Sequence, residues 1–367
     1  MQKHYARFER LPLRSGAMLH DVLLGYETAG ALNAAGDNAI LVCHHFSGHS
    51  HAAGRYSETD PQTGWWDALI GPGKPLDTDR YFVVSTDALG CVRTDAPHGL
   101  TTGPASLDPA TGKPYGPDFP ALDVRDTVLA QRMLLNQLGV QRLAAVAGPS
   151  FGGIQALTWA SSYPSIVERC IVAIGLAEFR AREIGLYHAM ETAIRLDPKF
   201  KGGRYAPEAP PLDGLALAIE LMIVTASGAD ELHAKFGRSH APRGTSDEWS
   251  IEGWLSMESR RRARICDANA WISMLRTNMR WDLAMGHRSL EDAIARLQAH
   301  VLLIPGRGDQ LLPASSYHDP LVDALTKART PFTVQPLSAT GGHLAGLSAI
   351  AEASDAIRAC LDKPRRT

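Results

Sequence analysis

The strongest constraint on the fold is an alternation of short apolar runs with helical patterns in the middle of the chain. LAAVAG (143–148) and CIVAIG (170–175) are continuous apolar runs, and between them apolar residues recur at helical spacing. A strand, a helix and a strand in this order are typical of a parallel sheet whose strands are buried on both faces. Further runs with strand character are AILVC (39–43), RYFVVSTD (80–87), HVLLIPG (300–306) and PFTVQPL (331–337). We therefore predict an α/β fold with a mostly parallel central sheet flanked by helices.

The alternation stops after Gly175 and resumes near residue 296. The stretch between shows mostly helical patterns, including the apolar run LALAIELMIVTA. A chain of 367 residues suits one large core with one inserted segment. We predict a core made of residues 1–176 and 296–367, with a helical cap over 177–295.

The composition of the chain limits the classes of molecule that it is expected to bind. The formal net charge of -2 gives no electrostatic reason to expect nucleic acid or an anionic membrane. No run of about 18 apolar residues and no signal-like opening segment is present, so we expect a cytoplasmic protein without a membrane partner. The five cysteines lack CxxC spacing and favour reduced thiols over a disulfide framework.

A candidate nucleophile lies between the two central apolar runs. Gly148-Pro149-Ser150-Phe151-Gly152 matches the pattern G-x-S-x-G, in which a sharp turn between a strand and a helix exposes the serine hydroxyl. Glycine permits the crowded backbone that such a turn requires. The alternative is a helix start rich in serine and glycine that has no catalytic role.

A serine nucleophile needs a base and an orienting acid, which in an α/β-hydrolase fold follow in the order Ser, Asp, His. Asp309 follows the run VLLIPG, and His343 follows the next predicted strand in a glycine-containing loop, ATGGHLAG. We predict that Ser150, Asp309 and His343 form a catalytic triad. The alternative is that Asp309 only caps a loop and that His343 is a structural loop histidine.

The transition state of acyl transfer also needs two donors for the developing oxyanion. We predict the backbone N–H groups of Phe151, directly after the nucleophile, and of Phe46, in the loop after residue 43. The histidines around this loop also allow a metal site, but they lack the companion cysteines or carboxylates of one. We expect no metal and no cofactor.

Two further features have a functional and a structural interpretation. Trp65 could line an acyl pocket, although adjacent tryptophans such as Trp65-Trp66 more often only fill the hydrophobic core. The run Arg260-Arg261-Arg262 could attract a phosphate-bearing donor such as coenzyme A. We interpret the run as a solvated helix face.

Over nearly its whole length the chain resembles the homoserine O-acetyltransferase family. The resemblance is carried by LGYETAGALN, NAILVCHHFSG, GWWDALIGPGKPLDTDRYFVVSTDALG, TTGPASLDPATGKPYGPDFP, GPSFGG and CDANAW. It implies an α/β-hydrolase core, a helical cap that commonly mediates homodimers, and a ping-pong mechanism through an acyl-serine.

The chain departs from the family pattern on the acceptor side. Family acetyltransferases carry an arginine and, seven residues later, a tyrosine on a cap helix, where this sequence has Ile219 and Ala226. Aspartate commonly follows the catalytic histidine, where this sequence has Leu344. The loop over 92–100 is also longer. Aliphatic side chains cannot pair with an α-carboxylate, so these changes predict an apolar acceptor pocket.

These departures resemble family members that hydrolyse simple esters. We therefore predict a carboxylesterase acting on small, short-acyl esters of the acetate type, with Ser150 and His343 as nucleophile and base. The alternative is an O-acetyltransferase that moves an acetyl group from acetyl-CoA, the coenzyme A thioester, to homoserine or another hydroxyl acceptor. A third possibility is a catalytically inactive scaffold that binds proteins through the cap.

Overall fold

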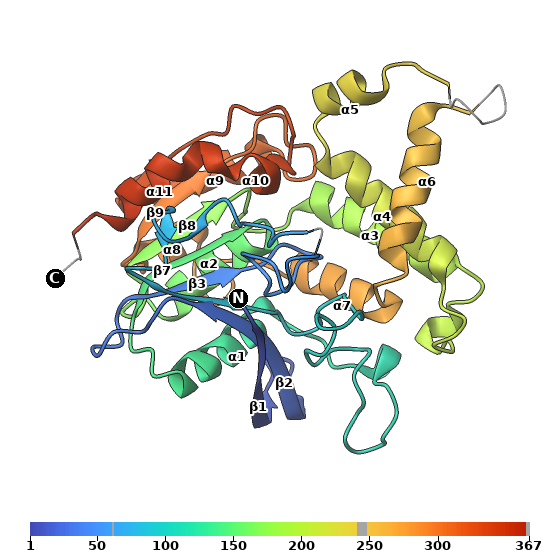
Figure 1. Cartoon of the computed structure of the whole chain (residues 1–367), viewed down its shortest axis with the longest axis horizontal. Helices are drawn as coiled ribbons and strands as arrows, with labels where there is room; N and C mark the ends of the chain where they lie inside the picture. Colours follow the sequence, from blue (N-terminus) through green and yellow to red (C-terminus); the bar gives the residue numbers. More distant parts are fainter. Residues whose placement is uncertain (61, 241–247, 365–367) are drawn as a thin grey trace.

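The computed structural model, which describes residues 1–60, 62–240 and 248–364, is built around an eight-stranded sheet (Figure 1). The strand order is β1–β2–β6–β3–β7–β8–β9–β10. The first three strands in this order pair antiparallel, and all pairs from β6 onward are parallel. The strands are β1 (Lys3–Pro12), β2 (Met18–Ala29), β3 (Ala39–Cys43), β6 (Phe82–Thr86), β7 (Leu143–Pro149), β8 (Arg169–Ala173), β9 (His300–Ile304) and β10 (Phe332–Val334). The predicted α/β-hydrolase architecture is therefore confirmed.

The apolar runs of the sequence are the buried centre of this sheet. Every residue of β3, β7 and β8 is buried. Alternate residues serve opposite faces, because successive side chains of a strand point in opposite directions. Leu41 belongs to the hydrophobic cluster on one face, whereas Ile40 and Val42 belong to the cluster on the other. The strands thus need apolar residues at every position.

Helices cover both faces of the sheet. On one face lie α1 (Val124–Gln137), α2 (Phe151–Ser162) and α9 (Ala314–Lys327), whose apolar residues join the cluster of Leu41. On the other face lies α11 (Ser354–Leu361), with Ile357 in the cluster of Ile40. The long β1–β2 hairpin extends beyond the body of the molecule in Figure 1.

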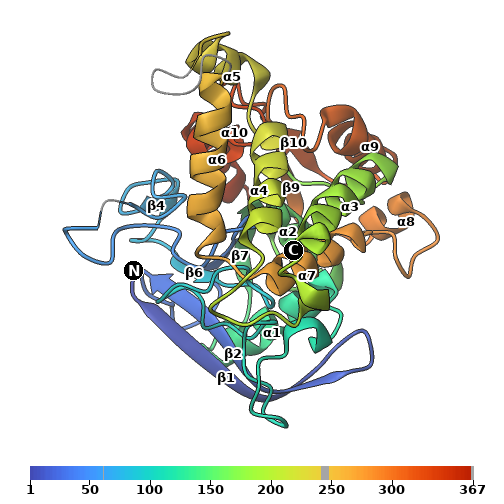
Figure 2. The same cartoon turned by 90° about the vertical axis from the view of Figure 1, so that its right-hand side faces the viewer.

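Within its described residues, the segment between β8 and β9 contains helices joined by loops and turns, and no named strand. It contains α3 (Ala181–Leu196), α4 (Leu212–Ala226), α5 (Ala229–Phe236), α6 (Ser250–Ala263), α7 (Ala268–Met279) and α8 (Leu290–Ala295). Helix α4 packs against both α3 and α6, and Figure 2 shows α4 and α6 rising side by side from the core. No helix in the described ranges is long and apolar enough to cross a membrane.

The chain end is not one continuous helix. It forms α10 (Ala345–Ser348), a 3-10 turn (Ile350–Ala353) and α11. The indole Nε1 of Trp66 donates a hydrogen bond to the carbonyl oxygen of Gly346 at 3.0 Å. A continuous helix would pair that carbonyl with the amide four residues later. The tertiary contact therefore accounts for the interruption.

Candidate functional site

Ser150 occupies a strained turn between β7 and α2. Its φ of 55° and ψ of -118° lie outside the regions that L-residues favour. The flanking glycines allow this geometry, because a Cβ on Gly152 would lie 2.1 Å from the carbonyl oxygen of Cys43 and one on Gly148 would lie 2.5 Å from Gly152. The turn leaves the serine at the amino end of α2, where the predicted nucleophile has to stand.

The structure brings Asp309 and His343 to this serine. His343 Nε2 lies 2.8 Å from Ser150 Oγ, and His343 Nδ1 lies 2.7 Å from Asp309 Oδ2. The other carboxylate oxygen of Asp309 accepts a hydrogen bond from the backbone N–H of Leu312 at 2.8 Å. All three side chains are buried. In this arrangement the carboxylate orients the imidazole, and the imidazole can take the hydroxyl proton.

The loop that carries His343 is fastened to the end of α4. The backbone N–H of Leu344 donates to the carbonyl oxygen of Ala226 at 3.1 Å, and Ser227 forms an isolated β-bridge with Gly342. Gly342 has a φ of 62°, and a Cβ on it would lie 2.8 Å from the backbone nitrogen of Gly228. Glycine at this position therefore lets the histidine loop approach the helix closely.

The two predicted oxyanion donors flank the serine. Phe151 is the first residue of α2, so its backbone N–H has no acceptor inside the helix. Phe46 lies in the loop after β3 and lines the same cavity as Ser150. Its ring packs edge-on against Trp271 and Tyr187, at centroid distances of 5.0 and 6.1 Å. These aromatic contacts hold the loop beside the serine.

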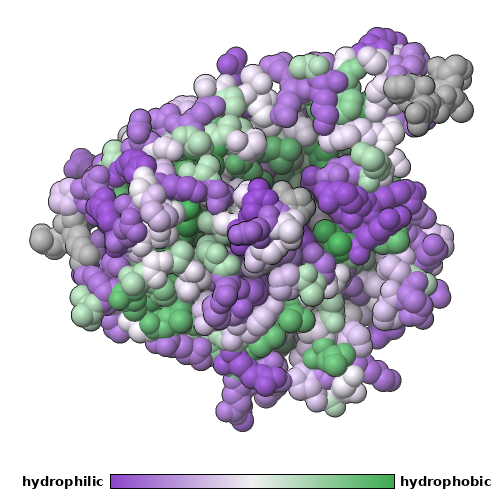
Figure 3. Space-filling view, viewed as in Figure 1, coloured by the Kyte–Doolittle hydropathy of each residue, from purple (hydrophilic) through white to green (hydrophobic). Residues whose placement is uncertain are grey.

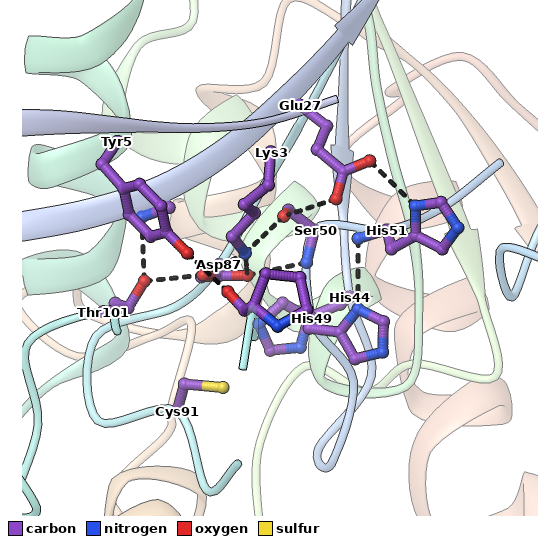
Figure 4. Close-up of polar contacts among 12 residues, drawn as sticks. Lys3, Tyr5, Glu27, His44, His49, Ser50, His51, Asp87, Cys91 and Thr101 are labelled. Carbon is purple, nitrogen blue, oxygen red and sulfur yellow. Dashed lines mark hydrogen bonds and ion pairs between the residues drawn. The ribbon is translucent and has the colours of Figure 1, made fainter. Parts of the chain in front are cut away.

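A buried charged network joins Ser50, which follows Phe46 in the same loop, to Lys3 and Asp87 (Figure 4). Lys3 Nζ, from the start of β1, lies 2.7 Å from Asp87 Oδ2 and donates to Ser50 Oγ at 2.7 Å. Asp87 also accepts the backbone N–H of Ser50 at 2.7 Å and the hydroxyl of Thr101 at 2.6 Å. A buried carboxylate is stable only with such partners. The network therefore ties the far end of the loop to the sheet.

The network continues to the wall of the cavity through Glu27, which is fully buried on β2. Its carboxylate accepts the hydroxyl of Tyr56 at 2.6 Å and lies 2.9 Å from Nδ1 of His51. The rings of His51 and Tyr56 stack at 3.9 Å, and both residues line the cavity. Sequence reasoning missed this network, because its members lie on five segments that are separate in the chain.

The cavity above Ser150 has a volume of about 530 Å³. It is lined by all four residues that the sequence proposed for a substrate pocket, namely Trp65, Ile219, Ala226 and Leu344, together with Ser150 and His343. Figure 3 shows hydrophobic side chains in a recess between α10 and α5, with hydrophilic ones around it. A cavity of this size that combines hydrophobic and polar side chains is typical of a small-molecule site.

Four cationic side chains also line this cavity, namely Arg93, Lys235, Arg261 and Arg262. The interpretation of the run 260–262 as a solvated helix face stays a prediction. The side chains of Arg260, Arg261 and Arg262 are 53%, 57% and 43% exposed, and the last two also line the cavity. Consecutive helical residues point in different directions, so the docking of α6 decides which of them reach the cavity. In the sequence, the run of three consecutive arginines was the feature that could have indicated cationic residues in the cavity.

Burial lowers the pKa of two histidines in the loop that contains Phe46. The pKa of His45 is lowered to about 3, first by burial and then by interaction with His44, His343, Arg262 and Arg93. Burial also lowers the pKa of His44, whose Nε2 accepts the backbone N–H of Ala88 at 2.9 Å. Among the described residues, no group of three or more His, Cys, Asp or Glu side chains could hold a metal ion.

Comparison with known proteins identifies relatives over the full length of the chain. Residues 38–335 match the family model of the alpha/beta hydrolase fold. The chain is 43% identical to a homoserine O-acetyltransferase of Symbiobacterium thermophilum, over 85% of this chain and 82% of that protein. It is 40% identical to a homoserine O-succinyltransferase of Halorhodospira halophila, over 99% of this chain and 95% of that protein.

Solved structures give the same picture of the fold. The structure of homoserine O-acetyltransferase from Bacillus anthracis is 36% identical, covers 100% of this chain and 99% of its own, and superposes with a TM-score of 0.94. The structure of esterase E22 is 37% identical, covers 98% of this chain and 100% of its own, and superposes with a TM-score of 0.93.

The prediction of a carboxylesterase as the main activity is overturned by the curated relatives, which are homoserine O-acyltransferases. That prediction depended on aliphatic residues at positions 219, 226 and 344. The structure places these residues in the cavity, as expected, but cationic side chains reach the same cavity from the 92–100 loop and from α5 and α6. Aliphatic residues at these three positions therefore do not make the cavity uncharged.

Proposed function

The chain belongs to the homoserine O-acyltransferase family of the α/β-hydrolase fold, and we propose that it transfers a short acyl group from a coenzyme A thioester to the hydroxyl of homoserine or of a similar small acceptor. The observation that carries the proposal is the hydrogen-bonded series Ser150–His343–Asp309 at the base of a cavity of substrate size. The names of the full-length relatives support homoserine as the acceptor.

The first half-reaction forms an acyl-enzyme. Ser150 Oγ attacks the thioester carbonyl while His343 Nε2 takes its proton, and Asp309 stabilises the resulting imidazolium. The negative charge on the carbonyl oxygen is met by the backbone N–H groups of Phe46 and Phe151. When the C–S bond breaks, His343 returns the proton to the departing thiolate, which leaves as free coenzyme A.

The second half-reaction uses the same groups in reverse order. The acceptor hydroxyl enters the cavity, His343 takes its proton, and the oxygen attacks the acyl carbon on Ser150. Collapse of the tetrahedral intermediate forms the product ester and regenerates the serine hydroxyl with the proton from His343. Aliphatic residues near the histidine, such as Leu344 and Ile219, support transfer to the acceptor because they leave few polar positions for competing water.

We further propose that residues 177–295 form the cap and carry a homodimer interface. Exposed large apolar side chains support this assignment, because several lie on helices of that segment. They are Ile184 and Leu196 on α3, Leu217 and Val224 on α4, and Met257 on α6. Exposed apolar groups of this kind favour protein association.

The experiment that tests the proposed activity measures coenzyme A release from acetyl-CoA with and without L-homoserine, and identifies the acetylated product by mass spectrometry. The proposal expects release that depends on homoserine, and a mass increase of one acetyl group on the enzyme when the acceptor is omitted. Ser150→Ala should abolish both signals. Ser161→Ala, at the other end of α2, is the matched control and should retain them. Coenzyme A release at the same rate without homoserine would contradict the proposal.

A further inference from the structure

The geometry points to a carboxylate-binding subsite formed by Arg93 and Arg262 at the wall of the Ser150 cavity. The identity of the molecule that brings the carboxylate depends on the proposed function, but the subsite itself depends only on the side chains described below. Neither arginine was singled out as a binding residue from the sequence, because one lies in a long loop and the other in a run of three.

Arg262 is held so that most of its donors remain available. Its Nε donates to Glu258 Oε1 at 2.7 Å, one helical turn earlier on α6. Among the described residues, its terminal nitrogens have no carboxylate partner. A guanidinium anchored through Nε keeps the paired terminal N–H groups that bind a carboxylate with two parallel hydrogen bonds. Glu258 therefore fixes the orientation of Arg262, which lines the cavity, and leaves its terminal N–H groups free of an ion pair.

Arg93 is held in a similar way from a different segment. Its Nε donates to Asp95 Oδ1 at 2.6 Å, and Nη2 donates to the other oxygen of the same carboxylate. Nη1 has no carboxylate partner within the described part of the chain. The backbone N–H of Thr94 donates to the carbonyl oxygen of Ile265 at 2.9 Å, and that of Asp267 donates to Val92 at 2.9 Å.

These backbone bonds place the Arg93 segment against the chain that leaves α6. Arg93 itself forms an isolated β-bridge with Cys266, four residues after Arg262. Two anchored guanidinium groups are thus brought to one wall of the cavity by two different segments. An anion between them would gain charge-assisted hydrogen bonds from both.

Both arginines line the cavity that contains Ser150 and His343. Both also contribute to the lowered pKa of His45, which lines the same cavity. The phosphates of a coenzyme A thioester are separated from the reacting carbonyl by the long pantetheine arm. We therefore assign the anion at these arginines to a carboxylate of a small substrate group.

Two substrate groups could supply that carboxylate. One is the α-carboxylate of an amino-acid acceptor. The other is the distal carboxylate of a succinyl group, since relatives of this chain include both O-acetyltransferases and O-succinyltransferases. Both present the same planar anion to the arginines, and the experiment below separates them.

The test compares wild-type enzyme with Arg262→Gln, Arg93→Gln and Arg262→Lys. Arg260→Gln is the matched control, because Arg260 belongs to the same run but pairs with Asp213 outside the cavity lining. The acceptor arm measures KM and kcat for L-homoserine and for L-homoserinamide, which keeps the amine but lacks the carboxylate. The donor arm compares succinyl-CoA with acetyl-CoA.

If the acceptor supplies the carboxylate, each glutamine variant raises KM for homoserine about tenfold or more and leaves KM for homoserinamide unchanged. If the acyl group supplies the carboxylate, the wild-type enzyme prefers succinyl-CoA to acetyl-CoA. Each glutamine variant then reduces this preference by a similar factor. Arg262→Lys should recover part of either effect, because it keeps the charge but not the paired donors. Arg260→Gln should match wild type.

The subsite would be overturned if the glutamine variants changed the kinetics of homoserine and homoserinamide equally and those of succinyl-CoA and acetyl-CoA equally. It would also be overturned if Arg260→Gln had the same effect as the other variants. Failure of the proposed function gives a different result, namely no acceptor-dependent coenzyme A release by any variant. The subsite is then still tested by inhibition of p-nitrophenyl acetate hydrolysis. L-homoserine should inhibit wild type competitively and Arg262→Gln about tenfold more weakly, and equal inhibition of the two would overturn the subsite.

Discussion

Lys3 Nζ and Asp87 Oδ2 lie 2.7 Å apart, with side-chain exposures of 5% and 0%. This ion pair joins the first residues of the chain to the segment after β6, and both side chains bond to Ser50 in the loop that carries Phe46 (Figure 4). Removing one partner of a buried ion pair leaves an uncompensated charge. The amino-terminal strand is therefore part of the support of the site.

We predict that Lys3→Met lowers the free energy of unfolding by about 3–5 kcal/mol, measured by urea denaturation. Lys113→Met, at an exposed position, is the control and should change it little. The double variant Lys3→Met/Asp87→Leu should recover part of the loss, because it removes both charges. A loss as small as that of the control would contradict a structural role for the pair.

A second prediction concerns the glycine after the nucleophile turn. Gly152→Ala should destabilise the protein by about 1–3 kcal/mol and reduce activity, because the added methyl group would overlap the carbonyl oxygen of Cys43. Gly185→Ala is the matched helical control, since no atom lies within 4 Å of a Cβ built there. That variant should be neutral or slightly stabilising, by about 0.5–1 kcal/mol. Thermal and urea unfolding check both, and equal behaviour of the two variants would refute the steric argument.

A third prediction follows from the buried histidines. Burial, with added charge from Arg93, lowers the pKa of His98 to about 4, and the pKa of His45 is about 3. Between about pH 4 and 6.5 the unfolded chain binds protons at these residues that the folded chain does not. Their contribution to stability is therefore present above this range and is lost as the pH falls through it.

The stability of His45→Asn should consequently depend less on pH in this range, by up to about 1.4 kcal/mol per pH unit. Urea unfolding at several pH values measures the slope. His20→Asn, at an exposed position on β2, is the control and should keep the wild-type slope. An unchanged slope for His45→Asn would show that this histidine is protonated in the folded protein.

A fourth prediction concerns association through the helices between β8 and β9. Leu217→Glu on α4 and Met257→Glu on α6, at side chains that are 48% and 64% exposed, should each raise the dimer Kd about tenfold or more. Leu107→Glu, 63% exposed in the loop before α1, should not. Sedimentation velocity over a concentration series measures Kd. A monomeric wild-type protein, or equal dissociation by the control, would contradict the predicted interface.

Much of the framework follows from local patterns. Continuous apolar runs mark buried parallel strands, and the glycines around Ser150 mark the sharp turn between β7 and α2. Because parallel strands end at one edge of a sheet, the meeting of Ser150, Asp309 and His343 could be expected from chain order. The break between α10 and α11 could not, since it depends on the indole of Trp66 reaching Gly346 from a distant segment.

The sequence by itself determined the fold, the family and the residues that meet at the serine, because each depends on short-range periodicity or on a motif with a fixed place in the sheet. Only the tertiary structure decided the charge of the cavity. The docking of α6 lets Arg261 and Arg262 line the cavity while Arg260 does not, and the pairing of Thr94 with Ile265 brings Arg93 to the same cavity. Such contacts join segments far apart in the chain, and no local pattern encodes them.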